Sequence, residues 1–277
     1  MKRQSITLVI VVMALFNVFT VTAQKLPTVQ QGSLRAPVDM KIDGIATEWD
    51  NKFQAYSKAT QLFYTMANND DQLYLTIKAA DPTTIIRILT HGITLSVDNG
   101  SKNPPVSITF PLIKRNDLGD VKSGVRKKGA NVTIVDSARA LRRADSVARA
   151  WNNQVILKAN AIKVTGIKDM GDTISVYDND IKAMMRFDNK KDCTYELALP
   201  LKYLAPEILN SGLLKYHITI NGADPAKGVN VQLSADGRAI ERSSPGNVSV
   251  VMVVPPEQIA LEFPTDFKGE YTLAKKP

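Results

Sequence analysis

The sequence contains very little cysteine, histidine or tryptophan, and these shortages exclude several kinds of site. Its 277 residues include one cysteine, two histidines and two tryptophans. With Cys193 as the only cysteine, an intrachain disulfide and a Cys-x-x-Cys redox site are excluded. The histidines, His91 and His217, are far apart and fit no zinc-binding spacing. The chain also has no glycine-rich phosphate-binding loop and no Gly-x-Ser-x-Gly motif, so nothing indicates the common nucleotide and acyl-transfer sites.

A long apolar run occurs only at the N-terminus. Lys2 and Arg3 precede an uncharged stretch, residues 6–21, which ends in the small residues of Val21-Thr22-Ala23. This order is typical of a cleavable signal peptide covering residues 1–23. An uncleaved anchor helix is the less favoured alternative, because the run is shorter than the ~20 residues that span a bilayer. The sequence therefore predicts a secreted or periplasmic protein with no membrane span after signal cleavage.

Positive charge exceeds negative charge. The chain has 35 Lys and Arg against 27 Asp and Glu, which gives a formal net charge of +8. Seven of these basic residues fall within the stretch 126–149. A basic protein favours acidic partners such as anionic glycans, anionic lipids or nucleic acid. Because the predicted export separates the protein from nucleic acid, we expect no nucleic-acid partner, and a solvated surface is the simplest interpretation of the basic stretch.

The alternation of apolar runs and turn residues along the remaining chain predicts one all-β domain. No linker, low-complexity tract or repeat divides it, so we expect an extended N-terminal lead at residues 24–36 and a single domain at residues 37–277. Short runs rich in Val, Ile, Tyr and Thr alternate with clusters of Asn, Asp, Gly and Pro, as strands alternate with turns. The predicted strands are residues 61–67, 72–80, 92–97, 106–111, 132–135, 155–164, 173–176, 181–187, 194–199, 213–221 and 248–253.

The clearest strands form a predicted hairpin. Residues 61–67 and 72–80 flank the polar segment 68–71, whose Asn and Asp residues suit a turn. In the second strand, Leu73, Leu75 and Ile77 alternate with Tyr74, Thr76 and Lys78. Alternate residues of a strand point to opposite faces, so the leucine and isoleucine side is expected to face the core.

One stretch breaks the strand pattern. Between residues 136 and 151, Leu141, Ala144, Ala148 and Trp151 recur at helical spacing, with arginines on the other side. We therefore predict an antiparallel β-sandwich of jelly-roll type with one amphipathic helical insertion. A second short helical piece is expected at residues 201–210.

Two segments resemble a known family. Residues 38–49 contain Ile42-Asp43-Gly44 followed by Glu48-Trp49, and residues 195–204 form a late strand that leads into a proline turn. Both are similar to family 9 carbohydrate-binding modules and the related DOMON-like β-sandwiches. Shorter matches follow in the same order at 71–81 and 93–98, so the resemblance covers roughly residues 38–255. It implies a β-sandwich, a sugar held between tryptophan rings, and calcium that orders loops.

The first motif also has a physical interpretation. Gly44 permits a backbone turn that a residue with a Cβ resists, and Asp43 can accept hydrogen bonds from the amides just beyond it. Trp49 then covers an edge of the core. We interpret Asp43, Gly44, Glu48 and Trp49 as a structural corner and not as ligand contacts.

The sequence departs from the family in its binding residues. One of only two tryptophans lies in the corner, so the candidates for stacking on a sugar are Trp151, Tyr64 and Tyr177. A core position is the simpler interpretation of Trp151. Asp169 and Asp172 belong to an acidic cluster and are candidate calcium ligands, because calcium prefers several oxygen donors. A solvated turn is the simpler interpretation of that cluster.

These observations predict an exported, non-catalytic accessory protein that binds a polysaccharide or oligosaccharide. One alternative is a structural or interaction protein of the cell envelope, with a protein partner. A second is a glycoside hydrolase-type enzyme, whose two carboxylates need lie only about 5–10 Å apart in the fold. A third is a haem-binding relative of the sandwich with Met184 or Met185 as a ligand, although methionine in a strand usually fills the core.

Overall fold

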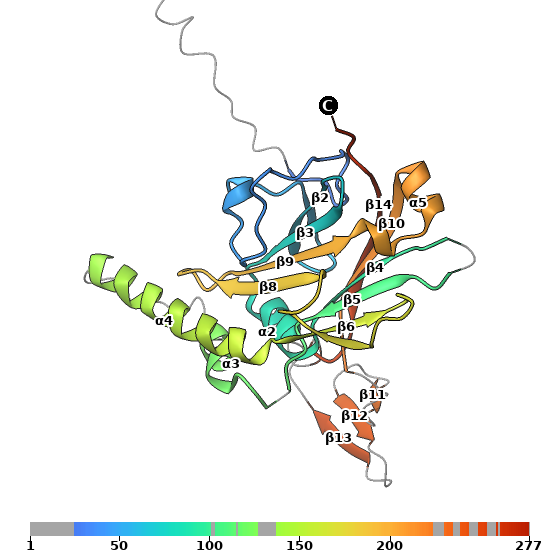
Figure 1. Ribbon diagram of the computed structural model, residues 1–277. Coiled ribbons are helices and arrows are strands. Elements are labelled where there is room, and N and C mark those ends of the chain that lie inside the picture. Colours follow the sequence, from blue (N-terminus) through green and yellow to red (C-terminus); the bar gives the residue numbers. More distant parts are fainter. Residues whose placement is uncertain are drawn as a thin grey trace, which may run out of the picture.

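The computed structural model describes residues 25–100, 103–114, 116–126, 137–223, 230–234, 239–243, 249–253, 259 and 261–276. These residues form a mostly β structure of three separate antiparallel sheets (Figure 1). The predicted signal peptide, residues 1–23, and the predicted strand 132–135 lie outside the described residues. Among the described helices, none combines the length and the apolar character that crossing a membrane requires.

The first sheet has five strands in the order β1-β2-β3-β9-β8. Its strands are β1 Ala55–Ser57, β2 Leu62–Asn68, β3 Gln72–Ala79, β9 Cys193–Pro200 and β8 Lys182–Phe187. The predicted hairpin of β2 and β3 is confirmed, and Asn69 closes its turn. The side-chain Oδ1 of Asn69 accepts hydrogen bonds from the amides of Asp71 at 2.9 Å and Gln72 at 2.7 Å.

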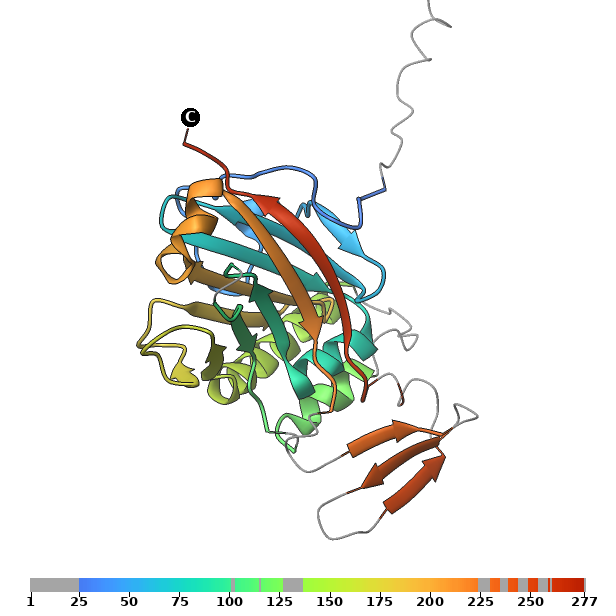
Figure 2. The ribbon, with the colours of Figure 1, turned by 90° about the vertical axis from the view of Figure 1, so that its right-hand side faces the viewer.

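The second sheet has six strands in the order β14-β10-β4-β5-β6-β7. Its strands are β14 Thr265–Thr272, β10 Leu213–Ile220, β4 Ile93–Val97, β5 Val106–Phe110, β6 Ala161–Thr165 and β7 Thr173–Ser175. Figure 2 shows β10 and β14 side by side in front of the strands of the first sheet. A third sheet contains β11 Asn230–Leu233, β12 Ala239–Ser243 and β13 Ser249–Val253.

Both larger sheets contribute their apolar faces to one core. From the first sheet, Leu75, Ile77 and Leu197 are at most 1% exposed, and from the second, Ile108 and Ile218 are fully buried. The alternation of side chains along each strand explains this arrangement. The predicted inward direction of Leu73, Leu75 and Ile77 is therefore confirmed.

The outer face of the first sheet is also covered in part. Tyr74 and Thr76 point away from the core, yet they are only 8% and 0% exposed. The indole Nε1 of Trp49, in the 3₁₀ turn η1 (Thr47–Trp49), donates a hydrogen bond to Thr76 Oγ1 at 3.0 Å. The segment 37–54 thus lies on this sheet, which the strand pattern alone did not indicate.

The helices are more numerous than the one insertion predicted. They are α2 Pro82–His91, α3 Gly119–Arg126, α4 Ser137–Lys158 and α5 Pro206–Ser211. The predicted helix at 136–151 is confirmed as α4, but α4 continues to Lys158, so the first part of the predicted strand 155–164 is wrong. The turn η2 (Leu201–Tyr203) and α5 occupy the second predicted helical piece. Helices α2 and α3 were not predicted from the sequence.

The segment before the corner, described from residue 25, joins the two larger sheets. Gln30 is 6% exposed and bonds twice to Met66 of β2. Its Oε1 accepts from the Met66 amide at 2.8 Å, and its Nε2 donates to the Met66 carbonyl at 2.8 Å. On the other side, the hydroxyl of Tyr271 in β14 donates to the Leu34 carbonyl at 2.9 Å.

Candidate functional site

The corner motif forms a turn that is fixed to the outer face of the first sheet. Gly44 has a φ of +80°, which favours glycine. The amides of Asp43 and Gly44 donate to Glu196 Oε2 at 3.0 and 2.9 Å. Asp43 in turn accepts a hydrogen bond from the Ile45 amide at 2.9 Å. Glu48 is half-buried in η1 and accepts a hydrogen bond from the neighbouring Thr47 hydroxyl at 3.3 Å.

Glu196 is the central residue of this corner. It is 0% exposed, and in the sheet register it lies between Thr76 of β3 and Met184 of β8. Its second oxygen, Oε1, is buried and has no hydrogen-bond partner among the described residues. Burial raises the pKa of this carboxyl to about 7, although the two backbone donors oppose the shift. The sequence signal for this residue was a glutamate inside an otherwise apolar strand, and its role was not predicted.

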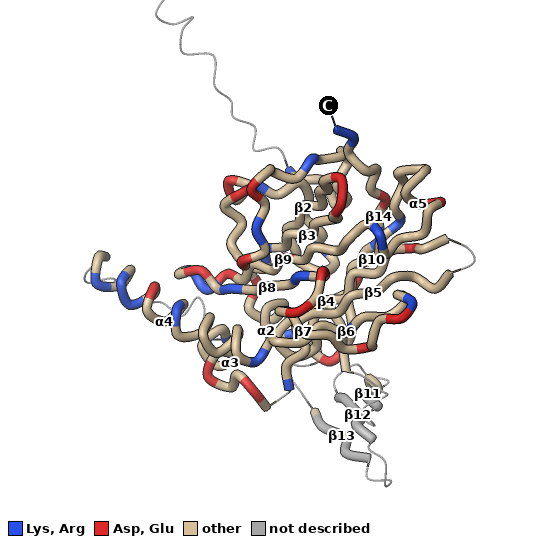
Figure 3. The backbone as a smooth tube through the Cα atoms, in the orientation of Figure 1, with Lys and Arg blue, Asp and Glu red and all other residues tan. Residues whose placement is uncertain are grey.

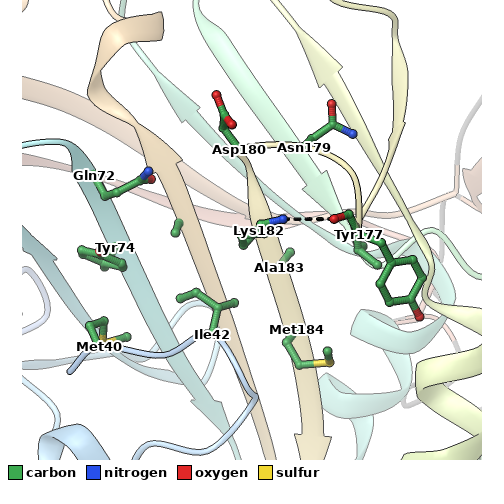
Figure 4. A pocket seen from close by; sticks show the side chains of 12 residues that line it. Met40, Ile42, Gln72, Tyr74, Tyr177, Asn179, Asp180, Lys182, Ala183 and Met184 are labelled. Carbon is green, nitrogen blue, oxygen red and sulfur yellow. Dashed lines mark hydrogen bonds between the residues drawn. The ribbon is translucent and has the colours of Figure 1, made fainter.

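A cleft opens beside the corner on the same face of the sheet. Its volume is about 560 Å³. Met40 and Ile42 of the corner segment, Tyr74 of β3 and Met184 of β8 give it an apolar lining. In Figure 4, the ring of Tyr177 lies on the other side of β8 from Met40, Ile42 and Tyr74. The cleft therefore has apolar side chains on one side of β8 and an aromatic ring on the other.

Polar groups line the same cleft. Gln72, Asn179, Asp180 and Lys182 contribute amide, carboxylate and ammonium groups. Lys182 Nζ donates to the Tyr177 carbonyl at 3.2 Å, so it fixes the loop that carries the ring (Figure 4). These side chains offer both donors and acceptors to a ligand that carries hydroxyl groups.

The carboxylate of Asp180 is held in its ionised form. It forms a close ion pair with Lys202 and accepts a hydrogen bond from the Tyr203 hydroxyl at 3.4 Å. The Lys202 ammonium lowers the pKa of Asp180 below its ordinary value. Asp180 can therefore accept hydrogen bonds at neutral pH.

The three candidate stacking residues lie in different places. Tyr177 is 57% exposed and lines the cleft. Tyr64 is fully buried, and its hydroxyl lies 3.0 Å from that of Tyr216. Trp151 is 7% exposed and packs edge-to-face on Phe187 with ring centroids 5.3 Å apart. A sugar platform needs an exposed ring face, and of these three rings Tyr177 is the exposed one.

The candidate calcium ligands lie away from the cleft lining. Asp169 and Asp172 are exposed in the segment between β6 and β7. In the described part of the chain, His, Cys, Asp and Glu side chains form no group of three or more that could hold a metal ion. Of the two candidate haem ligands, Met185 is fully buried in the core and Met184 lines the cleft.

Comparisons with known proteins give no match, whether to a family model, to a curated protein or to a solved structure. Any function therefore has to be argued from the site itself.

Proposed function

We propose that this chain is an exported, non-catalytic carbohydrate-binding protein and that its cleft beside the corner binds a polysaccharide or oligosaccharide. The observation that carries the proposal is Tyr177, an exposed aromatic ring at a cleft that also has apolar side chains and hydrogen-bonding groups. Sugar rings present apolar C–H faces and polar edges, so they bind where a flat ring lies near amide and carboxylate groups.

The proposal includes a finer description of the fold. We propose that the two larger sheets form a β-sandwich of jelly-roll type, similar to family 9 carbohydrate-binding modules. In support, their apolar faces belong to one core cluster, and the corner Asp43-Gly44 is bonded to Glu196 in β9. The motifs that carried the resemblance, 38–49 and 195–204, therefore meet in space.

The acidic content of the cleft lining favours binding over hydrolysis. Asp180 is the one acidic residue that lines it among the described residues. A paired-carboxylate glycosidase uses two acids, one of which has a raised pKa so that it can protonate the leaving group. The pKa of Asp180 is lowered by Lys202. An accessory binding role agrees better with this geometry than the glycoside hydrolase-type alternative.

A glycan-array screen of residues 24–277, with and without calcium, tests this function. We expect binding to neutral glycans that persists at high salt, since stacking does not depend on ion pairing. The variant Tyr177→Ala should weaken the strongest interaction by about tenfold, the equivalent of about 1.4 kcal/mol.

The matched control is Tyr177→Phe, which keeps the ring and removes only the hydroxyl. It should retain most of the affinity. Equal binding by wild type, Tyr177→Ala and Tyr177→Phe would contradict a site at this cleft. No binding to any neutral glycan would favour the structural role in the cell envelope.

A further inference from the structure

A second surface, the arginine stripe of α4, is distinct from the cleft. It consists of Arg139, Arg142, Arg143 and Arg149, all exposed. Their spacings of three, four and seven residues place them on one face of a helix with 3.6 residues per turn. Figure 3 shows this basic character along the outer part of α4. The stripe is therefore a continuous basic face and not a scatter of charges.

The opposite face of α4 attaches the helix to β8 of the first sheet. Trp151 and Val155 are buried, and the side chain of Asn152 bonds twice to the backbone of Phe187 in β8. Its Nδ2 donates to the Phe187 carbonyl at 3.0 Å, and its Oδ1 accepts from the Phe187 amide at 2.7 Å. Figure 1 shows the first turns of α4 extending past the β8–β9 hairpin. Because this face is attached to β8, the arginine face of α4 is exposed to solvent.

Neutralising acids are scarce near the stripe. The only carboxylate within α4 is Asp145, and its Oδ1 accepts a hydrogen bond from Asn189 Nδ2 at 3.0 Å. Among the described residues, Arg142, Arg143 and Arg149 form no ion pair. The exposed arginines of α4 outnumber its single acid, and such an excess of positive charge creates a field that attracts a polyanion.

We propose that the arginine stripe of α4 binds a linear acidic polysaccharide. All four side chains are arginine, whose planar guanidinium donates two parallel hydrogen bonds to a carboxylate, sulfate or phosphate group. Their repetition along the helix matches a polymer that carries such groups at intervals. This proposal does not depend on the neutral-glycan site, because it uses different residues and a different interaction.

The composition of the stripe argues against a membrane as the partner. On this face Ser146 lies between the arginines, and Ala150 and Asn153 follow Arg149; all three are small or polar. Leu157, 72% exposed, is the one large apolar residue there and lies near the helix end. A helix that lies in a bilayer surface needs a continuous apolar face for insertion. Polymer binding needs only the exposed charges.

The experiment measures affinity for heparin, a linear sulfated polysaccharide, using residues 24–277. The test variant carries Arg139→Gln, Arg142→Gln, Arg143→Gln and Arg149→Gln, since glutamine preserves helix propensity. The control carries Lys163→Gln, Lys168→Gln, Lys215→Gln and Lys268→Gln, four exposed positions outside α4. Both variants lose the same charge, so they separate a local site from the overall net charge.

We expect wild type and the lysine control to bind heparin with similar affinity and the arginine variant to bind roughly tenfold more weakly. Wild-type affinity should fall as salt rises from about 50 to about 200 mM, and the arginine variant should show a flatter salt dependence. Tyr177→Ala should bind heparin like wild type, so a failure of the neutral-glycan proposal can be told apart from a failure of the stripe proposal. Circular dichroism and thermal melting should show that both variants remain folded.

Several outcomes would overturn the proposal. Equal weakening by the arginine and lysine variants would assign the binding to net charge alone. Unchanged binding by the arginine variant would remove the stripe as the site. Tighter binding to phosphatidylglycerol vesicles or to duplex DNA than to heparin, measured in the same buffer, would assign the surface to a different class of partner.

Discussion

Glu196 lies fully buried between the first sheet and the turn at Asp43 and Gly44, and burial raises its pKa to about 7. An unfolded glutamate has an ordinary pKa of about 4.3. Between these two pH values, the folded protein binds more protons at this residue than the unfolded chain does. The stabilising contribution is thus fully present below about pH 4.3 and is lost as the pH rises through about 7.

We therefore expect the free energy of unfolding to fall by up to about 3 kcal/mol between pH 4.5 and 7.5 through this group. Chemical denaturation at several pH values measures it. Glu196→Gln, which stays neutral and keeps an oxygen acceptor for the two amides, should flatten the curve in this window. If Glu196→Gln retained the full pH dependence, other groups would be responsible for it.

Single residues also show where sequence reasoning reaches its limit. The alternation in residues 72–80 was enough to place Leu73, Leu75 and Ile77 in the core. It could not show that Thr76 and Glu196, on the opposite face, are buried as well. Their burial depends on residues 37–54, which lie on the sheet through long-range contacts. For the same reason, the strand pattern did not separate Tyr64, which is buried, from Tyr177, which is exposed.

At the scale of elements, α3 and α4 meet through a glycine. A Cβ placed on Gly124 of α3 would lie 2.2 Å from Cζ2 of Trp151 in α4. Gly→Ala normally stabilises a helix by up to about 1 kcal/mol. Here we expect Gly124→Ala to destabilise the protein by about 1–3 kcal/mol, because a rigid indole must move.

Gly119, the first residue of α3, provides the matched control. A Cβ at this position meets no atom within 4 Å. Gly119→Ala should leave the melting temperature unchanged or raise it slightly. If Gly119→Ala and Gly124→Ala both stabilised or both destabilised the protein, close contact with Trp151 would not be what constrains position 124.

Helix α2 illustrates why some elements were missed. Its sequence, Pro82 to His91, is rich in threonine and isoleucine, which favour strands. The sequence signal for the start of a helix was nevertheless present. Asp81 caps the helix by accepting a hydrogen bond from the Thr84 amide at 2.7 Å, and Pro82 takes the first position. Local capping outweighs strand propensity here, whereas α4 was identified because its apolar spacing was regular.

On the scale of the whole molecule, the lead at residues 25–36 connects the two larger sheets. Gln30→Ala would leave the Met66 amide and carbonyl without their side-chain partner in a buried position. We expect a loss of about 1–3 kcal/mol in the free energy of unfolding. Gln31→Ala is the control, because Gln31 is exposed and its Nε2 bonds to the nearby Val29 carbonyl at 2.8 Å and not to either large sheet among the described residues. Denaturant titration should show little change for Gln31→Ala, and equal losses would contradict the role of the lead.

The overall arrangement was only partly predictable. A β-rich fold with several strands followed from the alternation of apolar runs and turns. Strand β14 was missed because Phe267 and Tyr271 are its only large apolar residues, separated by charged side chains and Gly269. Which strands pair is decided by contacts between distant parts of the chain, and a single sequence does not display these contacts.

The bond between the Tyr271 hydroxyl and the Leu34 carbonyl joins residues 237 positions apart. Strand β14, which carries Tyr271, also pairs along its whole length with β10. A nascent chain has Leu34 long before it has Tyr271, so this contact cannot form until β14 has been synthesised. For the exported protein proposed here, this order of synthesis would leave the lead and β14 unjoined until β14 has been made, which suits passage of an unfolded chain through a narrow secretion channel.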